Sequence, residues 1–176
     1  MIPFEKLKQE VKLFKDDETS LYSCLVSFAK ESNLDGSFDN FYEQFLFDQR
    51  PDIRKAAVFS LLFCSRSQKN IHINKTVEFL IDKNEDSDLR IMSASSLGQA
   101  LFGSNDKKTM KMLYKVFIDE KYSFIGSACL AALLKIIGVS TRDMFFRGFD
   151  SSTEMNDDIE AAFSSELKLI KKVVNS

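Results

Sequence analysis

The sequence predicts an all-α protein in which similar helix pairs stack side by side. The strongest observation is a period of 36 residues, the interval that separates Ile53 from Leu89 and Leu89 from Ile125. Glycine and proline are scarce, at 6 and 2 of 176 residues, which favours helices joined by short turns over many short strands. No segment alternates apolar and polar residues long enough to suggest a sheet. A period of this length is typical of stacked repeat architectures.

Residues 1–34 are predicted to form a pair of capping helices ahead of the repeats. Apolar residues spaced three and four apart give the first helix one apolar face: Phe4, Leu7, Val11 and Phe14. The run from Asp16 to Thr19 offers an N-terminal cap for the second helix. We expect this pair to cover one end of the stack, because an uncapped end repeat exposes an apolar face.

Residues 38–138 are predicted to contain three clear helix pairs. The first helices are expected at 38–48, 71–83 and 106–119, and the second helices at 51–66, 86–102 and 121–138. Pro51 stands where a helix tolerates proline, in its first turn. A degenerate fourth pair is expected within residues 140–176, at 140–148 and 157–174, so residues 1–176 make a single repeat domain.

Each clear second helix begins with an aspartate, an aliphatic residue and an arginine, followed by alanine and leucine. The copies are Asp52-Ile53-Arg54 with Ala56, Ala57 and Leu61, and Asp88-Leu89-Arg90 with Ala94 and Leu97. The third copy has Phe124 and Gly126 in place of the aspartate and arginine. The pattern resembles the HEAT family of helical repeats. The resemblance implies a HEAT-like α-solenoid of about four helix pairs, in which the aspartate and arginine lock neighbouring repeats together.

The cysteines, the N-terminal residues and the net charge predict a cytoplasmic protein. The three cysteines are far apart and odd in number, which predicts free thiols in a reducing compartment. The residues after Met1 mix both charges and lack the apolar core of a signal peptide, and the run from Ala128 to Leu134 is too short to span a membrane. The net charge of −2 lacks the basic excess of a nucleic-acid binder, so neither nucleic acid nor membrane is an expected partner.

The sequence has no glycine-rich phosphate loop, no His-Glu-x-x-His, no paired Cys-x-x-Cys and no Gly-x-Ser-x-Gly. We therefore expect neither an enzyme nor a bound cofactor or metal. The single histidine, His72, is expected to be exposed or to cap a helix. Cys64 and His72 would form a nucleophile–base pair if they met. Cys64 shares a helical stripe with Ile53 and Leu61, however, and a thiol buried there is inert.

Two groups of residues are candidate partner-binding sites. Phe59 and Phe63 fall on the face predicted to line a concave groove, and the expected rim is Arg54, Lys55 and Arg66. This apolar spot is either an interface hot spot or the seat of the N-terminal helices. The second group belongs to an acidic ridge at the turns within repeats, which also includes Asp48 and Asp88; the candidate residues are Asp82, Glu85, Asp86, Asp119 and Glu120. It is either a recurring turn motif or a surface for a basic partner.

The expected function is a non-catalytic protein-binding module. Its sharper form is an immunity-type inhibitor that neutralises a toxin domain such as a basic nuclease. Inhibitors of this type are small, single-domain and often acidic, and some helical-repeat proteins resemble that description. One alternative is a regulatory adaptor subunit of a cellular enzyme. Another is a nucleic-acid binder like the HEAT-like DNA glycosylases, a pattern from which the chain departs in having no tryptophan and no basic excess.

Overall fold

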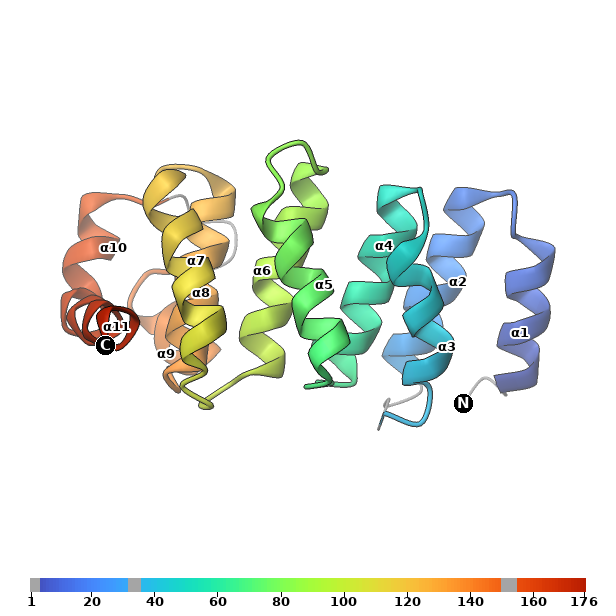
Figure 1. The fold of residues 1–176 in the computed structure, drawn as a ribbon, viewed down its shortest axis with the longest axis horizontal. Coiled ribbons are helices and arrows are strands. Elements are labelled where there is room, and N and C mark those ends of the chain that lie inside the picture. Colours follow the sequence, from blue (N-terminus) through green and yellow to red (C-terminus); the bar gives the residue numbers. More distant parts are fainter. Residues whose placement is uncertain (1–3, 32–35, 150–154) are drawn as a thin grey trace.

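The protein is all-helical, as the sequence predicts. The computed structural model describes residues 4–31, 36–149 and 155–176, and these ranges contain no strand. The helices follow one another along the long axis, with α1 (Phe4–Leu13) at one end and α10 (Asp157–Ala162) and α11 (Ser164–Asn175) at the other (Figure 1). Within the described ranges, no helix is both long and apolar enough to cross a bilayer.

The expected N-terminal helix pair is present. α1 packs on α2 (Glu18–Glu31), and α2 in turn packs on α4 (Pro51–Val58). The Asp17 carboxylate accepts hydrogen bonds from the backbone N–H and hydroxyl of Ser20, at 3.1 and 2.7 Å, which confirms the predicted cap. Leu7 and Leu25 are buried between these helices and the rest of the core. Residues 1–3 and 32–34 of the predicted cap lie outside the described residues.

The three predicted helix pairs are also present. Their first helices are α3 (Asp39–Glu43), continued by the 3₁₀ turn η1 (Gln44–Phe47), α5 (Asn70–Ile81) and α7 (Lys107–Asp119). Their second helices are α4, continued by the π-helical turn η2 (Phe59–Cys64), α6 (Ser87–Ala100) and α8 (Phe124–Ile136). Each helix begins and ends within a few residues of its predicted range, because caps such as Asp86 and Asp106 can be recognised in the sequence.

The second helices form one row and most first helices another. α2, α4 with η2, α6 and α8 each contact the next, whereas α5, α7 and α11 make the second row. Buried side chains at equivalent positions of the repeats hold the first row together: Ile53, Leu61, Leu89, Leu97 and Leu133. Small residues bring α6 close to α8, since a Cβ placed on Gly98 would lie 2.6 Å from the Cα of Ala132.

Two details depart from the predicted helices. The segment 157–174 is not one helix, because it breaks at Phe163, whose side chain is buried against Phe149 with ring centroids 5.9 Å apart. The segment 51–66 ends in a π-helical turn, where the Ser65 N–H donates to the Ser60 carbonyl at 3.0 Å. α9 (Thr141–Phe146) completes the chain between α8 and α10.

Candidate functional site

A long groove lies along the row of second helices. Its first part is a hollow of 470 Å³ beside α2, lined among others by Tyr22, Lys55 and Phe59. Its second part is a hollow of 330 Å³ between α6, α8 and α9. The two hollows share Phe63, Ile91 and Ser95, so they form one continuous surface, which we call the groove.

The groove contains the aromatic pair that the sequence singles out. The rings of Phe59 and Phe63 stack with centroids 5.3 Å apart and planes 17° apart. Phe59 is half-buried, with the Lys30 ammonium 5.8 Å from its ring centroid, whereas Phe63 keeps 37% of its surface exposed. The pair therefore contributes both to packing against the N-terminal helices and to an open apolar surface. Its π-helical backbone is a feature found often at functional sites.

α9 adds an aromatic edge that the sequence analysis did not identify. Met144 is buried and lines the groove with Phe145, while Phe145 and Phe146 are 65% and 70% exposed. The Arg142 guanidinium lies 5.4 Å from the ring centroid of Phe146. Two adjacent exposed aromatic side chains thus extend the apolar surface at this end of the groove. The signal in the sequence is the Met-Phe-Phe run itself, but only the fold places it beside α8.

The 36-residue period predicts which residues of the second helices lie on the face that lines the groove. Two repeats after Phe59 and Phe63, the matching positions are Ala131 and Lys135, and both line the groove. Ile91, one period after Lys55, was missed although the same interval points to it. Burial lowers the pKa of Lys135 below its ordinary value.

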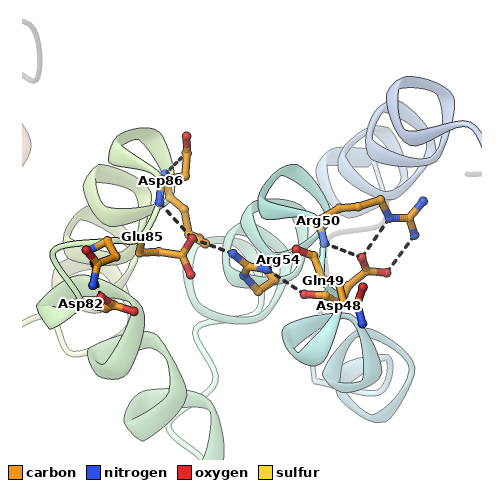
Figure 2. Close-up of polar contacts among 9 residues, drawn as sticks. Asp48, Gln49, Arg50, Arg54, Asp82, Glu85 and Asp86 are labelled. Atoms are coloured by element: carbon orange, nitrogen blue, oxygen red, sulfur yellow. Dashed lines mark hydrogen bonds and ion pairs between the residues drawn. The ribbon is translucent and has the colours of Figure 1, made fainter.

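Arg54 was expected on the rim of the aromatic pair, but it lies in the contact between two repeats. Its Nη2 is 2.6 Å from Oε1 of Glu85, and its Nη1 donates to the Asp48 and Gln49 carbonyls at 2.8 and 2.7 Å (Figure 2). Lys55 does line the groove, where it pairs with Asp52 at 2.7 Å. Arg66 is exposed at the end of η2, in a backbone conformation with φ of +53°.

The second arginine repeats this arrangement one period later. Arg90 Nη2 and Nη1 lie 2.5 and 3.2 Å from the two carboxylate oxygens of Glu120, and Nε donates to the Leu80 carbonyl at 3.0 Å. Both arginines thus fix a turn of the following repeat, which supports the structural interpretation of this motif. In the third copy a Cβ on Gly126 would lie 2.1 Å from the Glu120 carbonyl oxygen, so the chain has no room for a side chain there.

The acidic ridge consists mainly of turn and cap residues. Glu85 and Glu120 are half-buried in the arginine pairs just described. Asp82 accepts from the Asn84 N–H and Asp86 from the Leu89 N–H, each at 2.9 Å, although both aspartates remain exposed. Asp119 is exposed and forms no ion pair with the described part of the chain. Little of the ridge is therefore free to bind a basic surface.

His72 is not exposed and caps no helix, so that expectation was wrong. Its side chain is fully buried, with Nδ1 2.8 Å from the Ser67 hydroxyl and Nε2 3.0 Å from the Glu43 carboxylate. The order serine, histidine, carboxylate is that of a hydrolytic triad. Because Ser67 is also buried, we interpret the network as a structural link between α3 and α5.

The cysteines are free, as predicted, and are poor nucleophiles. Burial and the hydrogen bond to Glu10 raise the pKa of Cys24 to about 12, and burial raises the pKa values of Cys64 and Cys129 as well. Within the described ranges, no three His, Cys, Asp or Glu side chains are grouped closely enough to hold a metal ion.

Comparison with protein-family models and with curated proteins finds no match for this sequence. The geometry defines an all-helical protein with an apolar groove along one row of helices.

Proposed function

We propose that this protein is a HEAT-like α-solenoid of about four helix pairs that acts as a non-catalytic protein-binding module. The observation that carries the proposal is the groove, which runs from α2 to α9 and is lined by aromatic and aliphatic side chains. Repeat proteins use extended surfaces of this kind to bind other macromolecules.

The groove has the features of an interface centre. Phe63 and Phe145 are exposed aromatic side chains that line it, and Phe146 is exposed next to Phe145. Aromatic residues supply a large share of binding energy in protein interfaces. Phe63 sits on an element that packs against α2, α4 and α6, so little backbone freedom is lost when a partner binds.

The proposed partner is a toxin domain such as a basic nuclease, with this protein as its immunity-type inhibitor. The net charge of −2 supports a basic partner rather than an acidic one. A regulatory adaptor would use the same groove, and the identity of the bound protein distinguishes the two roles.

The test is affinity purification of the tagged protein from its own cells, with mass spectrometry of the bound proteins. We expect one stoichiometric partner with the wild type, loss of that partner with Phe63→Glu, and retention with the control Asp119→Asn. A nuclease silenced in the complex would support the inhibitor role. Retention with Phe63→Glu and loss with Asp119→Asn would overturn the groove proposal.

A further inference from the structure

The second part of the groove, which we call the cavity below, has the chemistry of a small-molecule site. Its 330 Å³ lie between α6, α8 and α9, in the size range of small-ligand pockets. Most of its wall is apolar, with Ile91, Ala128, Ala131 and Met144 among the lining residues. The side chains that α8 contributes to this wall are mostly alanine, and Phe145 of α9 lines the space as well.

Among the described residues that line this cavity, Lys135 is the one with a charged side chain. It is half-buried and forms no ion pair or side-chain hydrogen bond with the described residues. Arg54 and Arg90 each pair with a carboxylate, so a lysine in an apolar wall with no partner among the described residues is an exception. Partial burial disfavours the charged form of Lys135, and an anion bound beside its ammonium would offset much of that effect.

We infer that this cavity binds an amphipathic carboxylate, such as a medium-chain fatty acid. The hydrocarbon chain lies against Ile91, Ala128 and Met144, and the carboxylate pairs with the Lys135 ammonium. The lowered pKa of Lys135 accords with an environment that an anion would compensate. The inference does not depend on the proposed function, because it needs no protein partner.

The test compares decanoate with decanol, which has the same chain and no charge. Calorimetry gives the affinities at neutral pH, and NMR of the Ile91 and Met144 methyl groups reports whether the ligand occupies the cavity. We expect decanoate to bind wild type at least roughly tenfold tighter than decanol, as a charge-assisted contact allows. Each further methylene group should tighten binding roughly fourfold until the cavity is filled.

Two variants locate the contacts. Lys135→Met replaces the ammonium with an uncharged side chain of similar length. Decanol should therefore bind this variant as tightly as it binds the wild type, whereas decanoate should lose its tighter binding. Ala131→Phe fills the cavity and should abolish binding of both ligands. Lys83→Met, at an exposed lysine of the turn between α5 and α6, is the matched control and should change neither affinity.

Several outcomes would overturn the inference. They are equal binding of decanoate and decanol by wild type, undiminished decanoate binding by Lys135→Met, or methyl shifts confined to residues outside the cavity. Lys135 lies in the last turn of α8, where a cation also favours the helix dipole. A purely structural lysine would change the unfolding midpoint of Lys135→Met without changing the preference for the carboxylate.

Discussion

The Arg90 guanidinium of α6 donates two hydrogen bonds, of 2.5 and 3.2 Å, to the carboxylate of Glu120, the residue that follows α7. The Arg90 side chain is buried, so neutralising its partner leaves a charge without compensation. Glu120→Gln should lower the free energy of unfolding by about 2 kcal/mol in urea titrations. The matched control is Glu5→Gln, which breaks an exposed pair with Lys8 and should cost less than about 0.5 kcal/mol. Equal costs for the two variants would refute the structural role of this pair.

Gly126 stands where the earlier repeats have arginine. A Cβ there would lie 2.1 Å from the carbonyl oxygen of Glu120, so Gly126→Ala must displace backbone and should cost about 3 kcal/mol. Gly138→Ala is the control: its φ of +96° is unfavourable for alanine, but nothing lies within 4 Å of the new Cβ. We expect Gly138→Ala to lower the free energy of unfolding by about 1 kcal/mol. A smaller loss for Gly126→Ala than for Gly138→Ala in urea unfolding would contradict the observed close approach.

Arg147 joins α9 to the C-terminal helices through Glu166, with an Nη1–Oε1 distance of 2.7 Å. Its hydrogen bonds lower the pKa of Glu166 to about 2 from an ordinary 4.5. Because the folded-state pKa is the lower one, this pair stabilises the fold above pH 4.5 and loses its contribution as the pH falls towards 2. The free energy of unfolding of the wild type should therefore exceed that of Glu166→Gln by roughly 1 kcal/mol at pH 7, and the difference should vanish near pH 2. A constant difference across this range would exclude the linkage.

The buried network of His72, Ser67 and Glu43 offers a test of a structural role. His72→Phe preserves much of the volume but leaves the Ser67 hydroxyl and the Glu43 carboxylate without their partner. We expect the free energy of unfolding, measured by thermal or urea unfolding, to fall by about 2 kcal/mol. Partner binding by the folded protein should stay unchanged. Loss of binding at full stability would point instead to a functional histidine.

Local sequence signals predicted the helices well, since caps such as Asp17 and the apolar spacing act over a few residues. The period also placed Phe63 and Lys135 on one face, and both line the groove. Burial of His72 was missed because its partner Glu43 is 29 residues away. Long-range pairing of this kind leaves no local pattern.

The same limit explains the errors around the candidate site. Arg54 shares a helix with Phe59, yet its direction is set by Glu85 in the next repeat. The edge formed by Phe145 depends on how α9 folds back against α8, in a segment where the repeat has degenerated. Helical position could be read from the sequence, whereas contacts between repeats required the fold.

Photo-crosslinking from the groove tests the central claim most directly. A photoreactive phenylalanine analogue replaces Phe63 in one variant, Ser95 in a second and Asp119 in a third, and each is irradiated in the cells that produce the protein. Because Phe63 and Ser95 line both parts of the groove, we predict that these two positions capture the same partner and that position 119 does not. Capture from position 119, with none from the groove while the complex stays intact, would contradict the account.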